Sequence, residues 1–331
     1  MFGLMIILFT QTVLQINFGV VMAIIKINGF KCRYEVTGDK KARETIVFIN
    51  GIANPLESWG LVKKQLEFDY RVVTYDLRGQ WFSEVTEGQD YSFRTMAEDL
   101  NHLVEALNIP NFHVVGTSLG GEIAMWFQLL YPYKIKSLSV VASAPEVSEL
   151  MLRQIWRWKN KAVDAVIEIT NSQEPFATTK LMGHKFYQEM MPDVFCNKFI
   201  EENQELIAES EALVGDLCTL DFFKGHIKLC DMFARLKSDE RLTHHLSKIN
   251  CPAIFVAAEN DLVKPPKYSE HMHQKVPGSE YAVIKDAAHA VFFEKPDELS
   301  FVLMQFITKH ADGVTKMYPE MYGYSEGITI N

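Results

Sequence analysis

The amino-acid sequence predicts an α/β protein with a doubly wound, mostly parallel sheet and a helical lid inserted after the sixth strand. Short apolar stretches rich in β-branched residues alternate with amphipathic helical patterns, which is the order expected of βαβ units. The alternation stops at residue 146 and resumes at residue 251. The intervening segment, of roughly a hundred residues, is too long for an ordinary loop and has mainly helical periodicity.

Short strands are predicted along the chain. The first two form a hairpin within 24–36, because Asn28-Gly29 is a strong turn signal. The others are expected at 45–49, 70–75, 112–115, 135–142, 253–257 and 281–284. The four from 45–49 to 135–142 have no polar face, which is typical of parallel strands covered by helices on both sides.

Helices are predicted at 92–107, 119–130, 268–275 and 297–310. Ser92 is a suitable N-cap for the first of them. The segment 146–250 is predicted to be a lid of about four helices. The residues expected to divide it are Pro175, Pro192, Gly215 and Gly225.

A sharp turn between a predicted strand and a predicted helix carries a candidate nucleophile. Residues 116–120, Gly-Thr-Ser-Leu-Gly, have the G-x-S-x-G spacing of a nucleophile elbow. Gly116 and Gly120 remove side chains that would clash in the turn, and backbone strain projects the Ser118 hydroxyl above the sheet. The alternative is a glycine-rich connection with a surface serine, which the flanking strand and helix disfavour.

A serine nucleophile needs a base, and His289 is the candidate. It lies just past the last predicted strand, in the region where α/β folds place their sites. Four other histidines fall on a predicted helix or at the end of the lid and are interpreted as surface residues. They are His244, His245, His271 and His273.

The histidine in turn needs an acid that orients it, and Asp261 is the candidate. Asp261 follows the seventh predicted strand, and the order Ser118, Asp261, His289 is typical of such sites on this kind of sheet. Glu146 and Glu259 are the alternatives, since Glu146 also follows a strand and Glu259 is close to Asp261 in the chain.

Acyl transfer also needs two donors for the oxyanion. The N–H of Leu119, at the start of the helix, is expected to be one. The turn after strand 45–49 contains Gly51 and Ile52, and the Ile52 N–H is expected to be the other.

Over residues from about 23 to 310 these motifs resemble the α/β-hydrolase superfamily. Residues 76–83, Asp-Leu-Arg-Gly-Gln-Trp-Phe-Ser, resemble its D-x-R-G-x-G-x-S turn, and His289 with Glu294 and Pro296 resembles its G-H-x4-E-x-P ending. The branch that the chain resembles most contains 3-oxoadipate enol-lactonases, C–C bond hydrolases and esterases. The similar features are Asn50-Gly51, Trp126 and the Asp-Ala-Ala-His run at 286–289.

Two departures from the family pattern concern the pocket. Asn50 replaces the usual histidine, which changes the hydrogen bonding of the oxyanion turn. Trp81 replaces a usual glycine, which changes the loop and narrows the pocket. Trp81 is therefore one candidate pocket residue. Trp156, an aromatic residue of the predicted lid, is the other.

The expected activity is hydrolysis of a carboxylic ester or lactone through an acyl-enzyme on Ser118. Cleavage of a C–C or thioester bond by the same residues is one alternative, and a non-catalytic ligand-binding protein of the same fold is another. The serine argues against dehalogenases and epoxide hydrolases, whose nucleophile is an aspartate. The expected partner is a small ester, lactone or acyl molecule, with no cofactor and no metal.

Composition narrows the remaining possibilities. The net charge of −9 makes nucleic-acid binding unfavourable, because phosphate backbones repel an acidic chain. The five cysteines are odd in number and form no Cys-x-x-Cys pair, so a reduced, cytoplasmic setting is expected rather than disulfides or a thiolate metal site. The oligomeric state is expected to be a monomer or homodimer.

The first 21 residues are apolar but lack the positive start and cleavage site of a signal peptide. The expectation is a mis-assigned start codon or a disordered extension, with a membrane anchor as the less favoured alternative. The resulting division of the chain is an extension at 1–21, a core at 22–145 and 251–310, a lid at 146–250 and a tail without clear pattern at 311–331.

Overall fold

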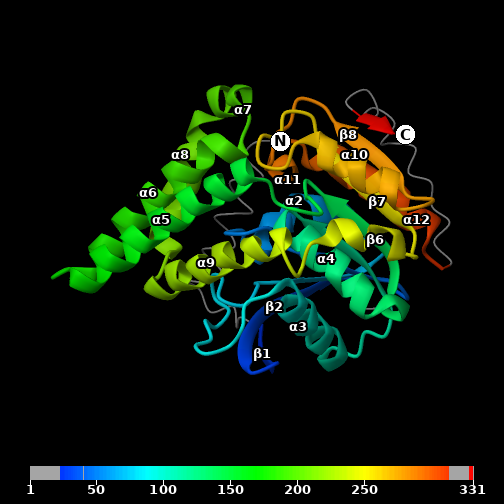
Figure 1. Ribbon diagram of the computed structural model, residues 1–331, viewed down its shortest axis with the longest axis horizontal. Coiled ribbons are helices and arrows are strands. Elements are labelled where there is room, and N and C mark those ends of the chain that lie inside the picture. The colour runs from blue at the N-terminus through cyan, green and yellow to red at the C-terminus, as the bar shows by residue number, and fades with distance from the viewer. Residues whose placement is uncertain (1–22, 40, 313–327, 331) are drawn as a thin grey trace.

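The computed structural model describes residues 23–39, 41–312 and 328–330 of the chain (Figure 1). These residues contain a nine-stranded sheet in the order β1-β2-β4-β3-β5-β6-β7-β8-β9. The strands are β1 (Ala23–Ile27), β2 (Phe30–Gly38), β3 (Thr45–Ile49), β4 (Arg71–Tyr75), β5 (Phe112–Thr117), β6 (Ile135–Val141), β7 (Ala253–Ala258), β8 (Glu280–Ile284) and β9 (Ile328–Ile330).

The sheet is mostly parallel, as the sequence predicts. All neighbours from β4 through β3, β5, β6 and β7 to β8 pair in parallel, whereas β1, β2 and β9 join the two edges antiparallel. Every residue of the central strands β3, β5 and β7 is buried. Apolar runs without a polar face therefore lie where both faces of the sheet are covered.

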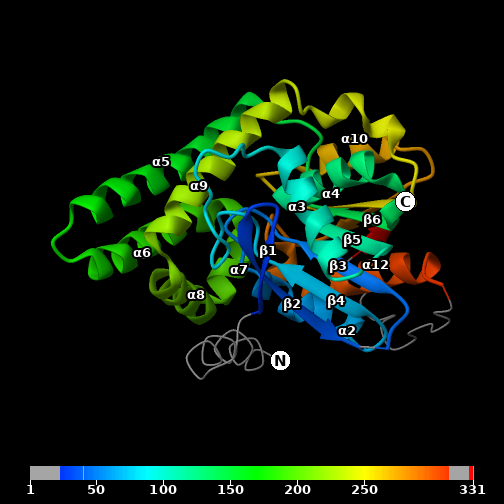
Figure 2. The same ribbon diagram turned by 90° about the horizontal axis from the view of Figure 1, so that it is seen from below.

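Helices cover both faces of the sheet, and Figure 2 shows α3 and α4 on the side opposite α2 and α12. One core cluster joins the sheet to α3, α4 and α10, and a second joins it to α2, α11 and α12. Their bounds are α2 (Gly60–Leu66), α3 (Phe93–Ala106), α4 (Leu119–Leu130), α10 (Pro266–Lys275), α11 (Val291–Glu294) and α12 (Pro296–Lys309). Ser92 caps α3 by accepting a hydrogen bond from the Thr95 N–H at 3.0 Å.

A helical segment is inserted between β6 and β7 and projects from the sheet (Figures 1 and 2). Its α-helices are α5 (Glu149–Asn171), α6 (Pro175–Val194), α7 (Asn197–Glu202), α8 (Gln204–Leu217) and α9 (Leu220–Met232). The 3₁₀ turns that follow are η3 (Phe233–Lys237), η4 (Leu242–His244) and η5 (Leu246–Lys248).

The expected division of this segment into four helices is wrong, because residues 146–250, all described, contain five α-helices. Pro175 does begin a helix, but Pro192, Gly215 and Gly225 lie inside helices. The two glycines provide close contacts instead of breaks. A Cβ on Gly215 would lie 2.6 Å from the ring of His184, and one on Gly225 would lie 1.7 Å from the carbonyl oxygen of Gly79.

The C-terminal strand β9 was not predicted, because three residues carry no periodic signal. It pairs with β8, with Ile328 opposite Ile284. The expected extension at 1–21 and most of the tail at 311–331 lie outside the described residues. Of the helices in the described ranges, none combines the length and apolar character that crossing a bilayer requires.

Candidate active site

The turn from β5 into α4 forces Ser118 into an unusual backbone conformation. Its φ is +50°, a region that residues other than glycine rarely adopt. A Cβ on Gly116 would lie 2.1 Å from the carbonyl oxygen of Gly120, and one on Gly120 would lie 2.1 Å from that of Ile49. Only glycine fits at these two positions, so the tight turn holds the serine at the carboxyl end of the sheet.

His289, in the loop between β8 and α11, lies between Ser118 and Asp261. Its Nε2 is 3.0 Å from Ser118 Oγ, and its Nδ1 is 2.8 Å from Asp261 Oδ2. In the tautomer with hydrogen on Nδ1, the histidine donates to the carboxylate and accepts from the serine hydroxyl. The exposed fractions are 5% for Ser118, 9% for His289 and 2% for Asp261, so the three groups are largely shielded from water.

Asp261 is held by the turn that follows β7. Its Oδ1 accepts the N–H groups of Val263 and Lys264, both at 2.8 Å. The other carboxylate oxygen is therefore left to face His289. The alternative acids are used elsewhere: Glu146 accepts from Arg241 Nε at 2.7 Å, and Glu259 accepts from the Asp286 N–H at 3.1 Å.

Sequence reasoning missed a buried ion pair beside these residues. Lys264, three residues after Asp261, extends its Nζ to within 2.6 Å of Glu122 Oε1, and Glu122 is four residues after Ser118 on α4. Burial raises the pKa of the Glu122 carboxyl, although the ammonium of Lys264 opposes this shift. The available signal was a charged residue shortly after each of two candidate site residues, four positions after Ser118 and three positions after Asp261.

The turn after β3 lies against Ser118. A Cβ on Gly51 would lie 3.4 Å from the Ser118 Cβ. The Ala53 N–H donates to Gln80 Oε1 at 2.7 Å. The N–H groups of Ile52 and Leu119 have no acceptor among the described residues. Of these two residues, Ile52 lines the cavity beside Ser118.

Asn50 performs a structural task in this turn. Its Nδ2 donates to the carbonyl oxygens of Tyr75 at 2.9 Å and Asn54 at 3.1 Å, and its Oδ1 accepts from Trp59 Nε1 at 2.9 Å. The amide thus ties the turn to the end of β4. The replacement of histidine by asparagine changes the donors but leaves the turn anchored.

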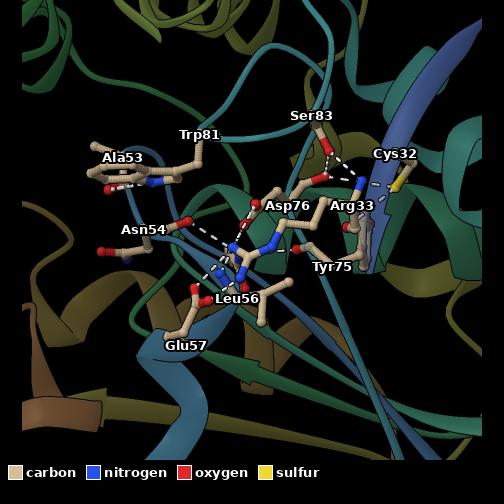
Figure 3. A network of polar contacts seen from close by, with 11 residues as sticks. Cys32, Arg33, Ala53, Asn54, Leu56, Glu57, Tyr75, Asp76, Trp81 and Ser83 are labelled. Carbon is tan, nitrogen blue, oxygen red and sulfur yellow. Dashed lines mark hydrogen bonds and ion pairs between the residues drawn. The ribbon is translucent and has the colours of Figure 1, made fainter. Parts of the chain in front are cut away.

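A second network anchors the other end of the same turn (Figure 3). Asp76 Oδ1 accepts the Leu56 N–H at 2.8 Å, and Asp76 Oδ2 accepts from Arg33 Nη1 at 3.2 Å. The Arg33 guanidinium also pairs with Glu57. Since Asp76 is fully buried, burial raises its pKa to about 7, while Arg33 opposes that shift.

Trp81 has φ +49°, so it occupies the left-handed conformation that the usual glycine would allow. Its indole N–H donates to the Ala53 carbonyl, a contact drawn in Figure 3. The N···O distance is 3.1 Å, and the centroid of its ring lies 4.6 Å from that of Phe222. Trp81 lines the cavity beside Ser118.

The expectation for Trp156 is wrong, because its side chain is 42% exposed and does not line this cavity. Trp158 lines it instead and donates its indole N–H to Asp193 Oδ2 at 2.8 Å. Two residues along a helix are about 200° of rotation, so the two tryptophans of α5 face opposite sides. The sequence showed both aromatic rings but not which side of α5 meets the rest of the protein.

The cavity has a volume of about 150 Å³, and Ser118 and His289 are among the residues that line it. The turn at 51–55 borders it on one side, and residues of α6 and α8 border it on another. Within the described ranges, no group of three or more His, Cys, Asp or Glu side chains is arranged to hold a metal ion. Ser118 and His289 thus line a mostly apolar cavity, and Asp261 is hydrogen-bonded to His289.

Comparison with known proteins identifies the fold family. Residues 44–296 match the family model described as alpha/beta hydrolase fold. A 3-oxoadipate enol-lactonase from Acinetobacter baylyi is 26% identical over 273 residues, which cover 82% of this chain and 91% of the relative. A putative carbamate hydrolase from Pantoea ananatis is 24% identical over 282 residues, covering 84% of this chain and 94% of the relative.

Solved structures show the same fold. The enol-lactonase from Burkholderia xenovorans LB400 superposes with a TM-score of 0.72 at 21% identity, covering 86% of this chain and all of that one. A thermophilic esterase from Thermogutta terrifontis superposes with a TM-score of 0.71 at 19% identity, covering 88% of this chain and all of that one.

Proposed function

The chain belongs to the alpha/beta hydrolase fold family and is a hydrolase, and on this premise we propose that it cleaves a carboxylic ester or lactone with Ser118 as nucleophile. His289 is the general base and Asp261 the acid that orients it. The observation that carries the proposal is the pair of hydrogen bonds through His289, 3.0 Å to Ser118 and 2.8 Å to Asp261.

In the first half of the proposed reaction, Ser118 Oγ attacks the carbonyl carbon while His289 Nε2 takes the hydroxyl proton. The carbonyl oxygen becomes an oxyanion, and the free N–H groups of Ile52 and Leu119 are the proposed donors to it. The tetrahedral intermediate then expels the alcohol oxygen, which receives the proton from His289. The products are the free alcohol and an acyl group esterified to Ser118. In a lactone both remain in one molecule.

In the second half, water attacks the acyl carbonyl and gives its proton to His289 Nε2. The second tetrahedral intermediate expels Ser118 Oγ, which takes that proton back, and the carboxylic acid leaves. Throughout, the Asp261 carboxylate stabilises the imidazolium that forms twice in the cycle. The reaction consumes one water and needs no redox partner.

The inserted segment is proposed to act as a lid. Residues of its helices α6 and α8 border the cavity that Ser118 also lines. A further tie links the insertion to the histidine loop, since the Ala290 N–H donates to the Val194 carbonyl at 2.8 Å. Covering of the site by this segment excludes water from the acyl group until hydrolysis.

The test uses p-nitrophenyl acetate and a fluorophosphonate probe on the purified protein. We expect turnover, a covalent adduct on Ser118 by mass spectrometry, and loss of both in Ser118→Ala. Ser238→Ala, which changes an exposed serine, is the matched control and should keep both. Full activity of Ser118→Ala would show that Ser118 is not the nucleophile. Absence of both adduct and turnover in the wild type would favour a ligand-binding protein.

A further inference from the structure

One face of α8 and one face of α6 border the cavity beside Ser118. From α8 the lining residues are Leu206, Ile207, Ser210, Leu213, Val214 and Leu217. Residues at this spacing lie on one side of a helix. The lining residues of α6, from Phe186 to Val194, recur at the same spacing. The two helices therefore present apolar stripes to a shared space.

These stripes are not fully used by packing within the protein. Leu206, Leu213 and Leu217 of α8 remain half-buried, as does Met190 of α6, although all of them border the cavity. Met190 and Leu217 pack in part against the core but keep exposed apolar surface, whereas Leu229 of the neighbouring helix α9 is fully buried. The half-buried faces of α6 and α8 thus leave apolar surface for a group that a ligand supplies.

The cavity offers no charge to such a group. Among the described residues that line it, none is Asp, Glu, Lys or Arg. Its polar side chains away from Ser118 and His289 are those of Asn54, Ser58, Tyr187 and Ser210. Burial raises the pKa of the Tyr187 hydroxyl to about 12, so this group stays neutral. A carboxylate placed here would lose its hydration without gaining a counter-ion, which is costly.

We propose that the substrate is an uncharged ester or lactone whose apolar acyl chain lies against α6 and α8, and that acyl chains ending in a carboxylate are excluded. This inference rests on the proposed hydrolytic function of Ser118 and adds the chemical class of the acyl group. The acyl half is the half that stays bonded to Ser118, and Ser118 is one of the residues that line the cavity.

Three p-nitrophenyl esters test the class of substrate: the butyrate, the hexanoate and the monoester of adipic acid. Each methylene that becomes buried raises kcat/KM by about fourfold, so the hexanoate should exceed the butyrate by at least about tenfold. The adipate monoester has the same chain length with a terminal carboxylate, and its kcat/KM should be at least about a hundredfold below that of the hexanoate. Equal values for the two six-carbon esters, or a decrease from butyrate to hexanoate, would overturn the inference.

A charged variant tests the place of the chain. Leu213→Lys puts a cation on the lining face of α8 and should lower the preference for hexanoate over the adipate monoester by at least about tenfold. Ala212→Lys, on the exposed neighbouring position, controls for long-range attraction and should leave the preference unchanged. If the melting temperature shows that Leu213→Lys is unfolded, Ser210→Lys makes the same test at a lining position that is already polar. An unchanged preference in a folded lining variant contradicts the inference.

Hydrolysis of p-nitrophenyl acetate separates this inference from the proposed function. The acetyl group is too short to gain from α6 and α8, so its turnover depends on Ser118 and the residues around it. Absence of acetate turnover and of labelling at Ser118 in the wild-type protein would contradict the proposed function. Retained acetate turnover with no preference among the three longer esters would contradict only the apolar acyl class.

Discussion

Lys264 and Glu122 form a buried ion pair that joins the loop of Asp261 to the helix that begins after Ser118. The Nζ–Oε1 distance is 2.6 Å, and the exposed fractions of the two side chains are 1% and 0%. Lys264 also donates its backbone N–H to Asp261, so one residue contacts both Asp261 and the α4 helix. The pair is therefore positioned to fix the separation between Asp261 and Ser118.

Breaking this pair should destabilise the protein. Lys264→Met leaves Glu122 buried without its partner, and we expect a loss of about 3–5 kcal/mol in the free energy of unfolding, measured in urea. The double variant Lys264→Met/Glu122→Leu should recover most of that loss, because neither charge remains. Lys309→Met, which removes one partner of the exposed pair with Glu280, is the control and should cost about 1 kcal/mol or less. Equal losses in the two single variants would show that burial of the pair has no special role.

Asp261→Asn should reduce kcat on p-nitrophenyl acetate by about 10⁴-fold, as expected when the acid of such a site becomes neutral. The Val263 and Lys264 N–H groups would still donate hydrogen bonds to the side-chain amide oxygen of this variant, so its side-chain NH₂ group would face His289 Nδ1. The ring would then carry its proton on Nε2 and fail to accept the Ser118 proton. Glu146→Gln is the matched control, with an expected change of less than about threefold, and the opposite ranking would move the acid to the end of β6.

Trp81 offers a test of backbone strain, because its φ is +49°. Both Trp81→Gly and Trp81→Ala remove the ring that packs on Phe222, but only glycine adopts this conformation without strain. We expect Trp81→Gly to be more stable than Trp81→Ala by about 1 kcal/mol, measured by urea unfolding. At positions with negative φ alanine is normally the more stable residue, so a more stable alanine variant here would refute the strained conformation.

His226, buried in α9, should make stability fall in acid. Burial lowers its pKa from 6.5 to about 3. Because the pKa in the folded protein lies below that in the unfolded chain, protonation favours unfolding. The contribution of neutral His226 to the free energy of unfolding is complete above pH 6.5 and is lost as the pH falls toward 3.

Between pH 7 and pH 5 the loss from His226 is about 2 kcal/mol in the free energy of unfolding. His226→Phe cannot titrate, so its unfolding free energy should depend less on pH over that interval. His102→Phe, on the exposed side of α3, should keep the wild-type slope. The same slope in all three proteins would mean that His226 is already accessible to protons in the folded state.

Much of the fold and the candidate site follows from local sequence patterns. Apolar runs without a polar face predicted the parallel strands, because a strand that is covered on both faces has apolar side chains on both. The position of Ser118 followed from Gly116 and Gly120, since the sterics of a tight turn involve only residues that are close in the chain. The candidates His289 and Asp261 followed from their places after β8 and β7, because parallel strands end at one edge of the sheet.

Other features depend on segments that meet only in the folded chain. Glu122 and Lys264 are 142 residues apart, so no local pattern paired them. The choice of Trp158 over Trp156 for the cavity depended on which side of α5 faces the rest of the protein. Local patterns thus determined the sheet and the three candidate site residues, because turn sterics and strand burial act over a few neighbours. Tertiary structure alone decided the ion pair and the apolar cavity, because packing between distant helices sets which side chains face each other.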